Sequence, residues 1–169
     1  MEKINFENFK SPGLSKEILM QLQDNIEEAI EDKNIITRNV ARQNITVSSG
    51  WGTTDIPLSS ENSIGNKLTS VLNGIKIGAN VSKVLVSAYF EGIGHTGADG
   101  DKSIGIEQNG TSIAGAYQSG DVTAGYMSSS IIPTLVNVSE GDVFSLSISS
   151  GGSGTFEILG GRLTVEVVL

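Results

Sequence analysis

The residues best suited to chemistry lie in a glycine-rich stretch, residues 92–102, which contains His95, Asp99 and Asp101. His95 is the only histidine of the chain, so a histidine-dependent catalytic triad would have to use it. Its small neighbours predict an exposed loop rather than a rigidly held general base. Asp99 and Asp101 could bind calcium, but calcium sites require several further oxygen ligands. We therefore expect no catalytic residue, metal or cofactor, and a calcium ion near these aspartates stays an alternative.

Aromatic residues are candidates for binding rather than for catalysis. Trp51, the only tryptophan, lies between two glycines and could form a platform on which a sugar stacks. Tyrosines in loops offer contact area at low entropic cost, and two of them border a second Gly/Ser-rich stretch. Packing of these rings within the domain is the alternative. The candidate binding residues are Trp51, His95, Asp99, Asp101, Tyr117, Asp121 and Tyr126.

Composition excludes several classes of partner and of site. The 169 residues include 19 acidic and 11 basic ones, which gives a net charge of −8 and no basic cluster for nucleic acid or anionic membrane. The chain has no cysteine, which excludes disulfides and zinc–thiolate sites. The N-terminus lacks the apolar core of a signal peptide, and no apolar run approaches the roughly 20 residues that span a bilayer. We expect a protein made in a cytoplasm.

Two segments near the C-terminus show the alternation that a half-buried strand requires. In residues 143–149 the apolar side chains of Phe144, Leu146 and Ile148 alternate with serines, and residues 162–169 repeat the pattern. Successive side chains of a strand leave opposite faces of the sheet, so each segment predicts one apolar face. The last segment is apolar enough to predict a strand in the interior of a sheet.

Further strand-like runs fill the preceding hundred residues. They cover residues 45–48, 68–77, 81–91, 104–106 and 131–138. Asn109-Gly110 between two alternating runs is a strong hairpin signal. About eight to ten short strands without a helix among them predict an antiparallel jelly-roll sandwich over residues 45–169. The fold class is therefore mainly β.

The N-terminal segment, residues 1–44, has a different pattern and forms a predicted attachment segment. Ser15 can cap a helix over residues 15–31, and the remainder to residue 44 reads as a linker or a continuation of the helix. Heptad spacing predicts a seam that associates with copies of itself or with another protein, because a helix of about 16 residues is marginal alone. Packing of this helix on its own β domain is the alternative. The seam residues are Leu19, Leu22, Ile26 and Ala29.

Two resemblances accompany these patterns. The segment Met1–Glu31 looks like the start of tail and structural proteins from phages of Gram-positive bacteria. The runs Lys83–Phe90, Glu107–Gly110 and Leu135–Leu146 are similar, in order and spacing, to the central strand, the hairpin and the Gly-Asp motif of C1q/TNF-like domains.

The resemblances imply a jelly-roll homotrimer with a role in a virion. On this hypothesis the protein attaches to other virion proteins through its N-terminal segment and binds a host cell-surface saccharide through its loops. Within that class a tail or baseplate receptor-binding protein is favoured, followed by a head fibre or decoration protein. The alternatives are a bacterial C1q-like surface or spore structural protein, or a cupin-type enzyme. Cupins need several histidines for their metal, and the chain has one.

Overall fold

The computed structural model describes residues 16–31, 34–48, 50–94, 102–118 and 126–168. The chain divides between Lys33 and Asn34 into two compact units, of which the second, Asn34–Leu169, is called the β unit below. The described part of the first unit is the helix α1, Lys16–Glu31. This confirms the helix expected over residues 15–31.

The apolar side chains of α1 are exposed to solvent. Ile18, Met20, Leu22 and Ile26 are 49%, 55%, 52% and 39% exposed. Leu19 is half-buried, and the side chain of Ala29 lies outside the described residues. The helix is not long and apolar enough to span a membrane, which holds for the part of the chain that the structure describes.

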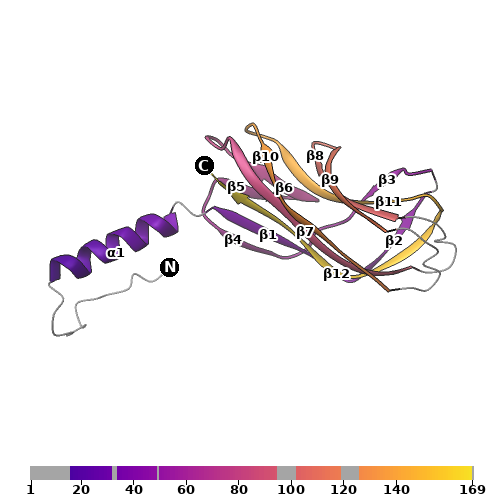
Figure 1. The fold of residues 1–169 in the computed structure, drawn as a ribbon, viewed down its shortest axis with the longest axis horizontal. Coiled ribbons are helices and arrows are strands. Elements are labelled where there is room, and N and C mark those ends of the chain that lie inside the picture. The colour runs from indigo at the N-terminus through magenta and orange to yellow at the C-terminus, as the bar shows by residue number, and fades with distance from the viewer. Residues whose placement is uncertain (1–15, 32–33, 49, 95–101, 119–125, 169) are drawn as a thin grey trace. The chain divides into compact units, whose positions relative to one another are not determined.

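The β unit is a sandwich of two antiparallel sheets (Figure 1). Sheet A has the order β10 (Tyr126–Asn137), β7 (Lys83–Gly94), β12 (Gly154–Val167), β1 (Ile35–Val40) and β4 (Glu61–Ile64), and β2 (Gln43–Val47) also pairs with β12. Sheet B has the order β5 (Leu68–Val71), β6 (Gly74–Ile77), β11 (Val143–Ser150), β8 (Lys102–Gln108) and β9 (Thr111–Gln118), and β3 (Thr53–Asp55) also pairs with β11. The protein is mainly β with a jelly-roll fold, as the sequence predicted.

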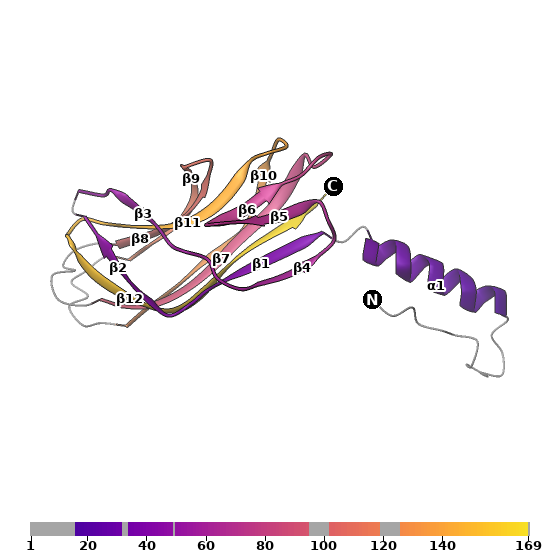
Figure 2. The ribbon, with the colours of Figure 1, turned by 180° about the vertical axis from the view of Figure 1, so that it is seen from behind.

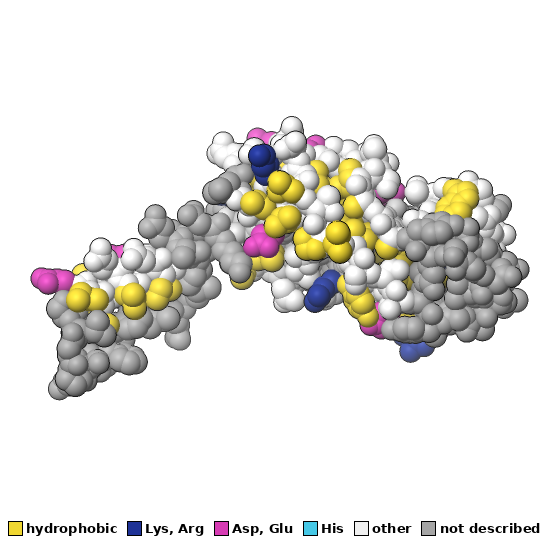
Figure 3. Space-filling model, in the orientation of Figure 1, with side chains coloured by type: hydrophobic (Ala, Val, Ile, Leu, Met, Phe, Trp, Pro, Cys, Tyr) yellow, Lys and Arg dark blue, Asp and Glu magenta, His cyan; other side chains and the backbone are white. Residues whose placement is uncertain are grey.

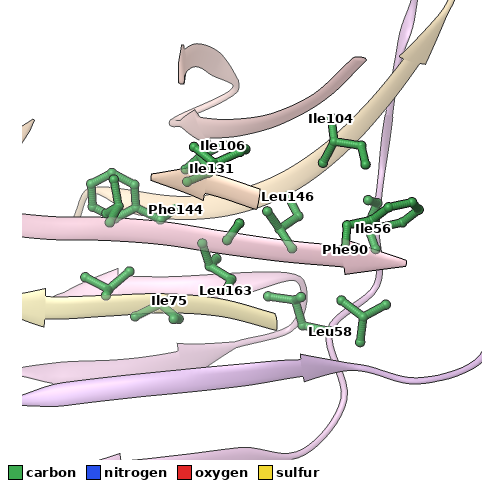
Figure 4. Packing of buried hydrophobic residues seen from close by; sticks show 14 of the residues in the cluster. Ile56, Leu58, Ile75, Phe90, Ile104, Ile106, Ile131, Phe144, Leu146 and Leu163 are labelled. Carbon is green, nitrogen blue, oxygen red and sulfur yellow. The ribbon is translucent and has the colours of Figure 1, made fainter. Parts of the chain in front are cut away.

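The core lies between the two sheets and consists of the inward faces of the alternating strands (Figure 4). Phe144, Leu146 and Ile148 of β11 are fully buried, and so are Leu163 and Val165 of β12. Each such side chain stabilises the fold by about 1.5–3 kcal/mol relative to exposure. Strand β12 lies between β7 and β1, which confirms the interior position predicted for the C-terminal strand.

The hairpin between β8 and β9 has the predicted two-residue turn. Asn109 and Gly110 both have positive φ, 53° and 77°. This is the geometry of a type I′ turn, whose twist matches that of the flanking strands. Gly110 adopts it without a steric cost, and asparagine tolerates it better than most residues.

Two sequence predictions are wrong in their details. The expected linker between the helix and residue 44 contains β1, so the compact β unit begins at Asn34 rather than at residue 45. The inward face of β1 carries Arg38 between two aliphatic residues, and this buried cation hid the strand pattern. Residues 68–77, read as one strand, form the hairpin of β5 and β6 instead, with its turn at Leu72 and Asn73.

Candidate functional site

The ends of the strands define two opposite ends of the β unit. At one end, called the loop end, Val47 of β2 pairs with Gly154, and Lys102 pairs with Ser150 and with Gln118. The same end therefore holds the turns after β2 and β11. It also holds the strand ends that flank residues 95–101 and 119–125, which lie outside the described residues. Figure 2 shows β2, β3 and β12 ending together there.

The other end, called the turn end, is where the chain enters the β unit. Asn34, just before β1, is buried, and its side-chain oxygen accepts hydrogen bonds of 3.0 Å from the backbone N–H groups of Asn66 and Lys67. Its carbonyl accepts from the N–H of Val167 at 2.8 Å. Residues 1–33 are thus joined to the turn end, the end of the sandwich that lies farthest from the loop end.

Trp51 is the aromatic residue that the structure places at the loop end. Its φ of 63° is unusual for a residue with a side chain, and such backbone strain concentrates at functional positions. A hydrogen bond of 3.0 Å from its N–H to the carbonyl of Ser150 holds the backbone in place. The turn after β2 is thereby fixed against the turn after β11.

The indole ring of Trp51 lies against a glycine and keeps much of its surface in water. A Cβ on Gly151 would lie 3.6–3.7 Å from three ring atoms, which is an ordinary van der Waals separation, so the ring rests against this turn. The side chain is nevertheless 45% exposed. A flat, supported and partly exposed indole offers an apolar face for stacking.

Lys102, which was not among the predicted binding residues, also lies at the loop end. It opens β8, is fully buried, and its Nζ lies 5.3 Å from the ring centre of Phe156. A cation over an aromatic face is favourable, and the cost of burying an ammonium group requires such compensation. No sequence signal indicated this role, because a lysine between a glycine-rich stretch and a strand normally lies in solvent.

Of the other predicted binding residues, only Tyr117 and Tyr126 fall within strands that the structure describes. Tyr117 lies near the end of β9 and Tyr126 begins β10, and neither side chain is among the described ones. The described residues do not include His95, Asp99, Asp101 or Asp121. The alternative of a calcium ion near Asp99 and Asp101 therefore also falls outside them. Within the described ranges, no three His, Cys, Asp or Glu side chains are grouped to hold a metal.

Comparison with known proteins identifies the fold. No protein-family model matches the chain, and no curated protein matches it in sequence. Among solved structures, the PRD1 vertex protein P5 is 15% identical with a TM-score of 0.56, over 80% of this chain and 97% of that one. Murine APRIL is 13% identical with a TM-score of 0.53, over 80% and 99%. The globular domain of zebrafish complement 1qA protein is 7% identical with a TM-score of 0.51, over 81% and 98%.

These three structures share the C1q/TNF-like jelly roll, which is therefore the fold of the β unit. At identities of 7–15% the likeness concerns the fold alone. It confirms the jelly-roll fold that the resemblance in Lys83–Phe90 and in the Gly-Asp motif near Asp142 implied.

Proposed function

We propose that the protein is a non-enzymatic component of a phage virion that binds a host cell-surface saccharide through the loop end of a trimeric jelly roll. The observation that carries the proposal is Trp51. Its ring is supported by Gly151, partly exposed, and held by a strained backbone at the end of the sandwich opposite to Asn34. Stacking of an aromatic ring on the apolar face of a sugar needs this combination of support and exposure.

The placement of the two ends supports a division between attachment and recognition. The chain enters the β unit at the turn end, so the proposed attachment through residues 1–33 and the proposed recognition surface are joined to opposite ends of the sandwich. Loops on a rigid scaffold are common sites of recognition. The likeness to a phage vertex protein supports a virion role for this fold.

In the proposed trimer, α1 provides one of the surfaces through which the copies associate. Ile18, Leu22 and Ile26 are exposed on the helix, and Leu19, Leu22, Ile26 and Ala29 keep the three-four-three spacing of a coiled-coil seam. A change of Leu22 and Ile26 to serine should weaken association and leave the β unit folded. Light scattering gives the native mass, and circular dichroism reports the fold of the same variant. Loss of the β signal would assign the helix to the domain core instead.

Binding is tested by titrating the full chain with purified capsular and cell-wall polysaccharides of Gram-positive bacteria. Because Trp51 is the only tryptophan, a saturable change in its fluorescence would report directly on the loop end. Calorimetry then compares Trp51→Ala with Glu140→Ala, an exposed residue of the turn end. We expect Trp51→Ala to weaken binding at least ten-fold, or about 1.4 kcal/mol, and Glu140→Ala to leave it unchanged.

Equal binding by Trp51→Ala and the parent chain would show that Trp51 is not the proposed platform.

Antibody labelling of purified phage particles tests the virion assignment separately. Label at the tail tip would favour a receptor-binding tail or baseplate protein. Label on the head would favour the fibre or decoration protein, an assignment that the likeness to a vertex protein supports. An absence of label, with the protein on a bacterial or spore surface, would favour the C1q-like structural alternative.

A further inference from the structure

Sheet B turns a face of small, hydroxyl-bearing side chains away from the core. The apolar residues of β11 fill the core, so the serines that alternate with them point to the outer side of the sheet. Strand pairing sets further small residues of β8 and β9 beside these serines. On the face of the β unit drawn in Figure 3, by contrast, hydrophobic side chains are gathered. The surface called the serine face below comprises Ser145, Ser147 and Ser149 of β11, Ser103, Gly105 and Glu107 of β8, and Ser112 and Gly115 of β9.

Two glycines leave space between the hydroxyl groups of this face. A Cβ on Gly105 would lie 3.3 Å from the Oγ of Ser147 and 3.6 Å from the Oγ of Ser112. A Cβ on Gly115 would lie 3.6 Å from the Oγ of Ser103. These hydroxyls therefore border the positions that larger side chains would fill. The glycines keep the hydroxyls unobstructed and let a ligand approach the strand backbone closely.

Two polar side chains of the serine face are deeply set and make no side-chain hydrogen bond in the structure, Glu107 and Ser147. Glu107 is 4% exposed and Ser147 is 3% exposed. Buried carboxylates and hydroxyls normally have partners, because burying them unpaired is unfavourable. Among the described residues, no side-chain nitrogen or oxygen atom that is closed off from solvent lacks such a partner. The oxygens of these two residues must therefore open onto the serine face, where their hydrogen-bond partners come from outside the chain.

The serine face begins beside Trp51, the residue that carries the proposed function. The N–H of Trp51 bonds to the carbonyl of Ser150, which follows Ser149 directly. The indole ring rests against Gly151, the next residue of the same segment, and so lies at the loop end of the serine column of β11. From Gly151 to Ser145 an extended strand covers about 20 Å, at roughly 3.3 Å per residue. Several linked sugar units would span this length.

The charged groups on and beside this face favour an uncharged ligand. Glu107 lies on the face, and the exposed Asp55 of β3 pairs with Ser147. Lys76 of β6 lies farther toward the turn end, where it pairs with Val143. Ionised carboxylates accept hydrogen bonds and donate none, so they suit hydroxyl and amide N–H groups and repel phosphate or carboxylate groups. The chemistry of the face therefore matches a neutral saccharide chain.

We propose that an uncharged saccharide chain lies along β11 on the serine face, with one sugar stacked on Trp51 and the following sugars bonded to Ser147 and Glu107. The carboxylate of Glu107 accepts hydrogen bonds from sugar hydroxyls, and Gly105 leaves room for a sugar ring above the strand. This inference rests on the proposed function, which places a sugar on Trp51. It adds that the site continues from the loop end along the outer side of sheet B, and that the ligand is an extended neutral polysaccharide.

The length of the ligand provides the first test. The probe is a neutral cell-wall polysaccharide of a Gram-positive bacterium, partly hydrolysed and separated by size from the monosaccharide to the hexamer, and calorimetry measures its binding to the full chain. Affinity should rise about ten-fold or more from the monosaccharide to the tetramer, because only the longer chain reaches Ser147 and Glu107. An affinity that is independent of length would overturn the inference and indicate a terminal sugar bound at Trp51 alone.

A substitution within the serine column provides the second test. Ser149→Leu places a bulky apolar side chain between Trp51 and Ser147, and should weaken binding of the tetramer about ten-fold or more while leaving binding of the monosaccharide unchanged. Thr69→Leu, at an exposed position of the outer strand β5 of the same sheet, is the matched control and should bind as the parent does. Equal binding of the tetramer by Ser149→Leu and the parent would overturn the inference. If Trp51→Ala still lost binding in that series, the proposed function would stand, whereas a parent chain that binds no saccharide would overturn both.

Glu107 allows a test that does not depend on the choice of saccharide. Glu107→Gln keeps the size of the side chain and should not lower the urea midpoint of unfolding, because the carboxylate has no hydrogen bond in the fold to lose. The same variant should weaken binding of the tetramer several-fold, since a neutral amide is a weaker acceptor than a carboxylate. A clear fall in the urea midpoint would assign the carboxylate to the framework of the fold and would overturn its role in binding.

Discussion

The two ends of the sandwich finish its strands in opposite ways. At the turn end, Asp142 accepts hydrogen bonds from Gln108 at 2.7 Å, from Asn109 at 2.8 Å and from the N–H of Ser139 at 2.9 Å. One carboxylate thereby joins the hairpin between β8 and β9 to the turn before β11. At the loop end, one indole ring rests on a glycine turn and remains partly exposed. The turn end is thus a framework that keeps the strands in register, whereas the loop end is a surface that is free to vary.

The largest expected effect comes from the core beside the turn end. Phe144 opens the buried face of β11 and is fully buried between the sheets. Phe144→Ala should lower the free energy of unfolding by about 3–5 kcal/mol, because it removes apolar contact and leaves a cavity. Urea unfolding measures this loss. An effect below 1 kcal/mol would mean that the two sheets are not closely packed at this end.

The hydrogen-bonded turns should show the next largest effect. Asp142→Ala removes the acceptor for Gln108, Asn109 and Ser139, and we expect a loss of about 1–2 kcal/mol in the free energy of unfolding. Glu140→Ala in the same turn is the control, since its side chain is exposed. Equal stability of the two variants would show that the carboxylate does not hold the turns together.

The same carboxylate should make the stability depend on pH. Hydrogen bonds from the Ser139 N–H, the Asn109 amide and, more weakly, the Gln108 amide hold the pKa of Asp142 below its ordinary value of 3.8, and together they outweigh the opposing effect of desolvation. Its stabilising contribution is complete above that ordinary value and is lost as the pH falls through the lower folded pKa. Asp142→Asn should therefore be less stable than the parent at pH 6, and the gap should narrow toward pH 3. A gap that widens on acidification would contradict this assignment.

The smallest effect on stability is expected at the loop end. Trp51→Gly removes the indole ring but also relieves the positive φ, which glycine adopts freely. The two changes oppose each other, so the free energy of unfolding should change by less than about 1 kcal/mol. Thermal unfolding measures this change in stability. Polysaccharide binding is measured on the same variant, which should lose it. A large loss of stability would place Trp51 in the framework rather than in a recognition surface.

The sequence predicted most of the framework because strand alternation and turn chemistry are local. The faces of β11 and β12, the Asn109-Gly110 hairpin and the interior place of the last strand followed from residues adjacent in the chain. Arg38 and Lys102 could not be predicted, because what permits their burial is contributed by residues far away in sequence. Trp51 was recognised as a candidate, but its support by Gly151, a hundred residues later, became visible only in the fold.

The strand order of sheet A has a consequence for synthesis of the protein. Strand β12 leaves the ribosome after β1 and β7, yet it lies between them and pairs with β7 along most of its length and with β1 over residues 161–166. Until it emerges, β1 and β7 have no common partner, and the pairing of Ile35 with Glu166 must await almost the entire chain. The β unit can therefore complete its folding only after β12 has emerged, and a truncated chain without β12 would expose strand edges prone to aggregation.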